Sequence, residues 1–224
     1  MIRTLMATAA LAAMAGACTV IGSGAIAQPA FTGTAEELPD SVIARMQASG
    51  SWREGCPVAL ADLRYLTMSF HDFAGGVQEG EMVVAADVAD AVLSAFQAMF
   101  EAGFVIERMQ LVDDYEANDD LSMAANNTSA FNCRAVTGGN GFSQHSYGNA
   151  IDINPIQNPY VRPRDTGDLI LPPEGIPFAD RADVRPGMIV AGDAVTAAFA
   201  AIGWVWGGDW VTLKDYQHFS ANGQ

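Results

Sequence analysis

The stretch SQHSYGNAIDIN, residues 143–154, places a histidine and an aspartate close together among small and apolar residues. Burying either side chain without a partner costs roughly a few kcal/mol or more, so something must compensate for their presence. Three explanations are open for His145 and Asp152. They could bind a metal, form a hydrogen-bonded structural pair, or lie in a solvated loop with no special role.

The local pattern favours a meeting of these two side chains. The sequence AIDIN, residues 150–154, alternates in polarity, and as a strand it would turn both isoleucines to the core and Asp152 to the opposite face. Gly148 can provide the turn that brings His145 back toward that face. Zinc accepts imidazole nitrogen and carboxylate oxygen at about 2.0–2.2 Å, and a catalytic zinc usually has three protein ligands. One further ligand is therefore required.

Two other histidines are available, His71 and His218. His71 lies within a predicted strand, where a half-buried or paired histidine is the simpler interpretation. His218 ends the sequence WGGDWVTLKDYQH, and Asp215 precedes it in the same stretch. An extended strand would place Asp215 and His218 on opposite faces, whereas a bend or helical turn would bring them together. A joint function requires that bend.

Taken together, the run SxHxxGxAxD and the later DxxH resemble a family of secreted bacterial zinc peptidases that cut peptidoglycan peptides. This family comprises D-Ala-D-Ala carboxypeptidases, VanY-type and VanX-type enzymes, and L-alanyl-D-glutamate endopeptidases. The resemblance extends from about Cys56 to Phe219 and includes the blocks NNTSAFNCR and WGGDW. The fixed positions of the first motif are Ser143, His145, Gly148, Ala150 and Asp152.

The resemblance implies a role for each candidate residue. The zinc ligands would be His145, Asp152 and His218, and Asp215 would be the general base that takes a proton from water. Arg134 would stabilise the oxyanion, and the substrate-binding residues would include Ser143 and Trp210. Many relatives carry glutamate at the base and tryptophan just before the last histidine, whereas this chain has Asp215 and Gln217. An aspartate base is more similar to the endopeptidase branch.

The resemblance also implies an α+β fold, a small antiparallel sheet with flanking helices in one hedgehog-like or D,D-peptidase-like domain. The hydrophobic patterns agree with this class. They predict strands over residues 63–73, 104–112 and 129–136, an acidic loop over 113–127, and helices over 83–103 and 193–204. The proline-rich segment 155–186 cannot be an interior helix or central strand, and it could either wall a cleft or form a surface excursion.

Aromatic residues commonly line ligand pockets, so the cleft could also contain Trp204, Trp206 and Trp210. Core packing is the alternative for two of these three tryptophans.

The N-terminus predicts export. Residues 1–27 contain a positive charge at Arg3, an apolar run and an Ala-x-Ala site, as a secretory signal peptide does. The apolar run is too short for a membrane span of about 20 residues, so we expect no stable membrane insertion after cleavage. Lipid attachment at Cys18 is the less favoured alternative. Residues 28–50 resemble a leader segment or a short helix, and 51–224 would be the catalytic domain of a periplasmic or secreted monomer.

Removal of the signal peptide would leave two cysteines, Cys56 and Cys133. An even number of cysteines in an exported protein predicts a disulfide between them, with two buried free thiols as the alternative. The net charge of −15, with Lys214 as the single lysine, argues against binding to nucleic acid or anionic lipid.

The leading hypothesis is a periplasmic zinc peptidase that acts on peptidoglycan stem peptides, with the L-alanyl-D-glutamate endopeptidase type favoured. A D,D-carboxypeptidase of the same family is the second hypothesis, and it would need a cation for the substrate carboxylate, such as Arg162, Arg164 or Arg181. A non-catalytic domain that reads cell-wall peptides is the third. Such a domain would be expected to lose the base, whereas Asp215 is present.

Overall fold

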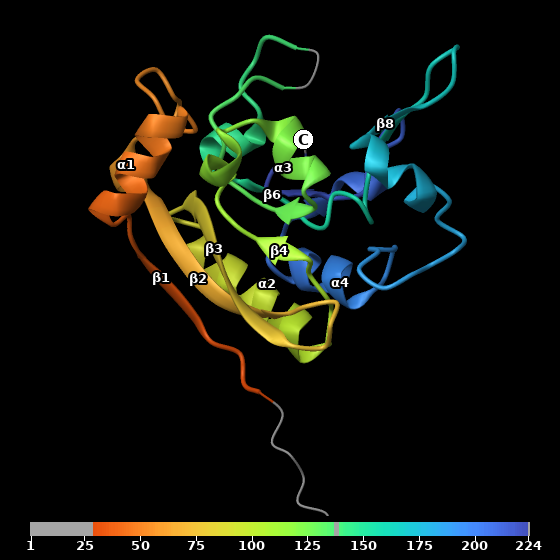
Figure 1. Ribbon diagram of the computed structural model, residues 1–224, viewed down its shortest axis with the longest axis horizontal. Helices are drawn as coiled ribbons and strands as arrows, with labels where there is room; N and C mark the ends of the chain where they lie inside the picture. Colours follow the sequence, from red (N-terminus) through yellow and green to blue (C-terminus); the bar gives the residue numbers. More distant parts are fainter. Residues whose placement is uncertain (1–28, 137–138, 224) are drawn as a thin grey trace, which may run out of the picture.

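The computed structural model describes residues 29–136 and 139–223. They form a mixed α+β fold in which helices pack against small sheets (Figure 1). The α+β class predicted from the sequence is confirmed. Within the described residues the strands are divided among three three-stranded antiparallel sheets and one parallel pair, where a single small sheet was expected.

The first sheet has the order β1 (Gly33–Glu37), β2 (Leu63–His71), β3 (Val77–Ala85). Helix α2 (Ala89–Glu101) packs against β2 and against α4 (Ala194–Ala201) (Figure 1). Its buried face belongs to the main core. The strand predicted at 63–73 is therefore confirmed, whereas the helix predicted at 83–103 begins later. Residues 83–85 still pair with β2 as the end of β3, because their apolar, β-branched side chains suit a buried strand.

Residues 28–50, interpreted as a leader segment or a short helix, contribute to this sheet and to a second core. Strand β1 pairs with β2, and helix α1 (Asp40–Ser49) follows it. Val42 and Met46 of α1 are buried against Leu63 and Cys133. The expected signal peptide, with Cys18, lies outside the described residues.

The second sheet has the order β6 (Ala150–Asp152), β11 (His218–Ser220), β9 (Val205–Trp206). His218 and Asp152 face each other in register across β11 and β6. Phe219 of β11 is buried and its ring stacks on Phe199 of helix α4 (Ala194–Ala201), with 4.2 Å between ring centroids. This confirms the helix predicted at 193–204 and shows what holds β11 in place.

The third sheet has the order β10 (Lys214–Asp215), β7 (Tyr160–Arg162), β8 (Leu169–Leu171). The proline-rich segment contains β7, β8 and the short 3-10 helix η4 (Pro173–Phe178) and no interior α-helix, as its prolines required. The expectation that it holds no central strand is wrong, because β7 is the middle strand of this sheet and its three residues include no proline.

The region between α2 and the motif has less regular structure than predicted. Of the strands predicted at 104–112 and 129–136, the first is reduced to β4 (Arg108–Met109), which pairs in parallel with β5 (Asn127–Thr128), and the second forms isolated bridges. The acidic loop contains helix α3 (Asp119–Ala124), because the side chain of Asn118 caps it by accepting a bond from the N–H of Leu121. The remaining 3-10 helices are η1 (Leu60–Asp62), η2 (Val112–Tyr115), η3 (Gln144–Tyr147) and η5 (Gly207–Asp209).

Arg181 fastens the proline-rich segment to the rest of the fold. Its guanidinium donates to the carbonyl oxygens of Gln157 and Ile189 and lies 4.4 Å from the ring centroid of Tyr216. Burial lowers the pKa of Arg181 to about 10, and the nearby Tyr216 and Asp193 oppose that shift. These contacts give Arg181 a structural role.

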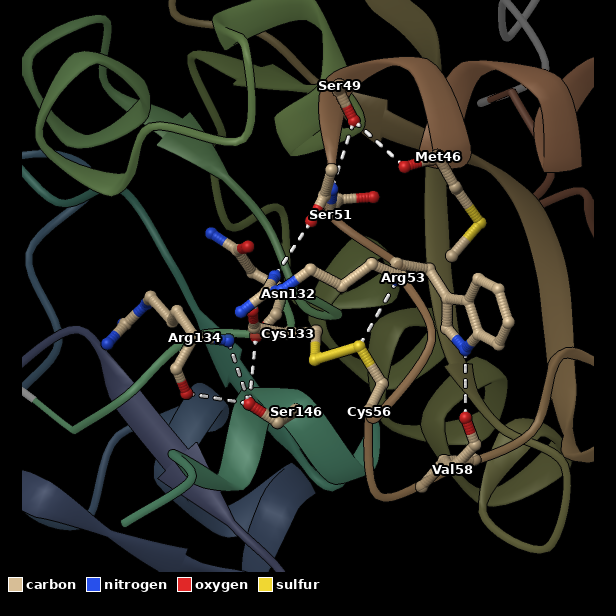
Figure 2. The surroundings of a disulfide bond; sticks show 12 residues. Met46, Ser49, Ser51, Arg53, Cys56, Val58, Asn132, Cys133, Arg134 and Ser146 are labelled. Atoms are coloured by element: carbon tan, nitrogen blue, oxygen red, sulfur yellow. Dashed lines mark hydrogen bonds between the residues drawn. A yellow bond between two sulfur atoms is a disulfide. The ribbon is translucent and has the colours of Figure 1, made fainter. Parts of the chain in front are cut away.

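The predicted disulfide is present between Cys56 and Cys133 (Figure 2). It joins the segment that follows α1 to the strand-like segment that carries Arg134. The guanidinium of Arg53 donates to the carbonyl oxygen of Cys133 over 2.7 Å, and the N–H of Cys133 donates to the carbonyl of Ser51 over 2.8 Å. A disulfide is typical of proteins in oxidising compartments.

Removing this disulfide should lower the free energy of unfolding by about 2–4 kcal/mol, because the bond closes a long loop in the unfolded chain. The cysteines are separated by 77 positions in sequence. The double variant Cys56→Ala/Cys133→Ala avoids a lone thiol, and urea titration against the wild-type protein measures the difference. Equal unfolding midpoints with equal slopes would contradict the expectation.

None of the helices in the described part of the chain is both long and apolar enough to cross a membrane.

Candidate active site

Two side chains of the second sheet and one of η3 form a buried polar cluster, and they are the residues that the sequence selected as ligands. His145 lies in η3, Asp152 ends β6 and His218 begins β11. The Nε2 atom of His145 lies 3.2 Å from Asp152 Oδ2 and 3.3 Å from His218 Nδ1, and His218 Nδ1 lies 3.0 Å from Asp152 Oδ1. All three residues are buried.

The turn that delivers His145 is built as the sequence indicated. The side chain of Ser143 caps η3 by accepting from the N–H of His145, and Gly148 ends η3 with a φ of 71°. A Cβ atom at Gly148 would lie 2.4 Å from the backbone nitrogen of Ala85. Glycine is therefore required at this position both for the left-handed conformation and for the close approach to β3.

The protonation of the cluster favours a cation between its members. The Nδ1 atom of His145 lies 2.6 Å from the carbonyl oxygen of Ala130, so in the neutral ring Nδ1 donates and Nε2 is left as an acceptor. That acceptor faces the carboxylate of Asp152. In the metal-free protein, burial opposes ionisation of Asp152, but the charge and hydrogen bonds of His145 and His218 outweigh it and hold the pKa of this carboxyl well below its usual range. A cation between these groups would take the place of the shared protons.

A zinc ion fits these donors. Bonds of about 2.0–2.1 Å in a tetrahedral site place neighbouring ligand atoms roughly 3.3 Å apart, close to the separations within the cluster. The bond from His145 Nδ1 to a backbone carbonyl is the outer contact that orients metal-binding histidines. Within the described residues, His145, Asp152 and His218 are the only group of this kind that could hold a metal ion.

The comparison with known families covers the segment that contains these residues. Residues 137–221 match the model of a family described as D-alanyl-D-alanine carboxypeptidase. This segment is a metallopeptidase domain of that family. The match contains the three clustered side chains and Asp215, and membership implies peptide substrates. No curated protein and no solved structure matches the chain.

The cluster of this peptidase lies at the floor of a cleft of about 260 Å³. The predicted residues Arg134, Ser143, Trp210 and Asp215 all line it. Trp204 and Trp206, in contrast, are buried in the main core, so core packing holds for two of the three tryptophans. Further lining residues that the sequence analysis did not select are Val136, Phe142, Gln144, Tyr160 and Leu213.

Asp215 lines the cleft of the peptidase because the chain bends between Asp215 and His218. This is the bend that the sequence requires if these two residues act together. Strand β10 ends at Asp215, residues 216–217 form a turn, and β11 begins at His218. The Oδ1 atom of Asp215 is buried and has no hydrogen-bond partner. Burial raises the pKa of Asp215 to about 7, the charge of Asp152 adds to the rise, and His218 opposes it.

Tyr160 was not selected from the sequence, although it stands opposite Asp215 in register across β7 and β10. No motif marks it, because its place in the cleft depends on the pairing of two short strands that are distant in sequence.

The raised pKa of Asp215 predicts a pH-dependent stability for the metal-free peptidase. Because the folded-state pKa lies above the unfolded value of 3.8, the folded protein binds more protons between these values and loses stability as pH rises through this window. Asp215→Asn removes that loss. We expect the variant to be more stable than wild type at pH 8 by up to about 4 kcal/mol, at ~1.4 kcal/mol per unit of pKa shift, and to show no gain at pH 3.5.

Urea unfolding in the presence of a chelator measures this difference at each pH. A gain of the same size at pH 3.5 and pH 8 would contradict the assigned pKa.

Proposed function

We propose that the protein is a zinc-dependent peptidase that hydrolyses peptide bonds in peptidoglycan stem peptides. The observation that carries the proposal is the buried group of His145, Asp152 and His218, which shares one cleft with the carboxylate of Asp215 inside the family-matched segment. A non-catalytic binding domain has no use for a buried carboxylate with an oxygen that lacks a hydrogen-bond partner at that place. The retention of Asp215 therefore favours an enzyme.

Each of several residues in the cleft would have a separate role in peptide hydrolysis. Zinc held by the cluster would supply a Lewis acid that polarises a peptide carbonyl and acidifies water. Asp215, whose Oδ1 is free to accept, would take a proton from the attacking water and return it to the leaving amine. Arg134 would donate to the oxygen on which negative charge develops. Trp210 Nε1 is a buried donor without a partner, and with Ser143 it would orient the peptide.

The charges of the cleft favour an endopeptidase, of the L-alanyl-D-glutamate type, over a D,D-carboxypeptidase. A carboxypeptidase needs a cation for the terminal carboxylate of its substrate. Among the residues that line the cleft, Arg134 is the only arginine or lysine, and it is ion-paired with Asp119. Arg181 is occupied by backbone carbonyls, and Arg162 and Arg164 are exposed and outside the lining.

The experiment that tests the proposal is digestion of purified muropeptides by the zinc-loaded protein, followed by mass spectrometry. New N-terminal D-glutamyl ends would support the endopeptidase, and release of free D-alanine would instead support the carboxypeptidase. Peptides that bind but remain intact over long incubation would favour the binding domain and contradict the proposal.

The place of action follows from the same proposal. We propose that residues 1–27 direct export, that residues 28–224 act as a monomer in the periplasm or outside the cell, and that the mature chain is not inserted in a membrane. The Cys56–Cys133 disulfide supports an extracytoplasmic location.

A further inference from the structure

Arg134 is held through its side chain by an aspartate that the sequence analysis left unassigned. Asp119, the first residue of α3, places its Oδ2 atom 2.9 Å from Arg134 Nη2. Both side chains are about three-quarters buried, with exposed fractions of 24% and 22%. Ion pairs that are largely shielded from water hold their geometry better than exposed ones.

The backbone of Arg134 is held on two further sides (Figure 2). The hydroxyl of Ser146, in η3 beside His145, accepts from the N–H of Arg134 over 2.9 Å and lies 2.8 Å from its carbonyl oxygen. On the other side, Cys133 is tied by the disulfide to Cys56. Main chain and guanidinium therefore have independent anchors, and the main-chain anchors connect Arg134 to the turn that carries a cluster histidine.

These anchors leave one edge of the guanidinium unused. Nη2 is paired with Asp119 and Nη1 lies 3.3 Å from the carbonyl oxygen of Ala135. The Nε atom of Arg134 is buried and has no partner, although Arg134 lines the cleft. A buried donor without an acceptor is costly, and it is typical of a site that a ligand completes.

We propose that Asp119 is a positioning residue for the peptidase reaction, which fixes the guanidinium of Arg134 so that its free edge faces the substrate oxygen. This inference rests on the proposed function, because it assigns the orientation of a group that only matters if a peptide is cleaved in the cleft. Asp119 does not belong to the metal-binding group, so it acts through Arg134.

A second role follows from charge. An unpaired arginine beside the cluster would attract the carboxylates of Asp152 and Asp215, which also lie in the cleft. By pairing with Asp119, Arg134 keeps its place and does not form an ion pair with either carboxylate. Preorganised donors stabilise a transition state without reorganising during the reaction, which is the benefit of such an anchor.

A double-mutant cycle on the zinc-loaded protein tests the inference, with muropeptide cleavage as the readout. We expect Asp119→Asn to lower kcat by about 10–100-fold with KM changed by less than about threefold, because the lost orientation matters mainly in the transition state. In an Arg134→Ala background, Asp119→Asn should cost less than about twofold more. Equal losses in both backgrounds would show a general structural role and overturn the inference.

The matched control is Asp120→Asn, which removes the same charge from the neighbouring, exposed position of α3. It should retain wild-type kcat. A loss equal to that of Asp119→Asn would reduce the effect to helix charge and overturn the inference.

A second measurement on the wild-type protein does not depend on activity or on the folding of a variant. Nitrogen NMR of the arginine side chains should show slowed rotation of the Arg134 Nη groups, whereas the exposed Arg164 should show averaged signals. Averaged signals for Arg134 would contradict its fixed position. A wild-type protein that cleaves no muropeptide but shows a fixed Arg134 would instead contradict the proposed function and leave the anchor supported.

Discussion

His218→Ala should abolish both metal binding and peptide cleavage. The change removes one of the three ligand groups of the cluster, and it leaves the carboxylate of Asp152 without the partner that faces it across β6 and β11. Two remaining ligands do not make a stable zinc site. Elemental analysis of the purified variant and cleavage assays in the presence of added zinc measure the two losses.

His71 provides the matched control, since it is the one histidine outside the cluster. Its ring stacks on Phe100 with 4.2 Å between centroids, and it is not among the residues that line the cleft. His71→Ala should keep the zinc content and the cleavage rate of the wild-type protein. A His218→Ala protein with full zinc occupancy and activity would rule out His218 as a ligand.

Asp215→Asn should lower cleavage by about 10²–10⁴-fold while zinc remains bound, because general acid–base catalysis usually contributes that much and the three ligands are untouched. The amide cannot accept the proton of water as the carboxylate can. Cleavage by the variant is measured over a zinc titration, with bound metal determined at each step.

The competing role for Asp215 is to orient His218, whose charge opposes the rise in the pKa of Asp215. In that case the variant should bind zinc about 10–100-fold more weakly and recover its activity in excess zinc. Recovery would contradict the assignment as general base. Asp209→Asn changes an exposed aspartate of the same WGGDW segment and should have no effect on either quantity.

The cluster itself could be predicted because its information is local. Alternation over 150–154 gives the face of Asp152, and Gly148 gives the turn that returns His145. His218 could be selected because the chain offers so few histidines. The separation of His218 from the other two could be bridged only by the family resemblance, since no local pattern pairs β11 with β6.

Other parts of the site could not be predicted, because they depend on contacts between distant segments. Asp119 lies in an acidic run that is typical of a solvated loop, and nothing in that run points to Arg134. Arg181 belongs to a proline-rich segment and resembles a free surface cation, although carbonyl groups surround it. The start of α2 was misplaced because the apolar run 83–85 suits a strand as well as a helix.

The close contact between Gly148 and Ala85 imposes a steric constraint on the motif, which differs from the functional constraint on His145 and Asp152. Any side chain at Gly148 would collide with the backbone of β3, so steric exclusion alone prevents other residues at this position. His145 and Asp152, in contrast, serve the cleft. Consider a library randomised over residues 143–152 and screened only for folded protein. Glycine should be retained at position 148 in almost every folded variant, whereas His145 and Asp152 should be replaced by other residues. The same library screened for peptide cleavage should retain all three residues. The two screens would therefore distinguish the residues required for folding from those required for activity.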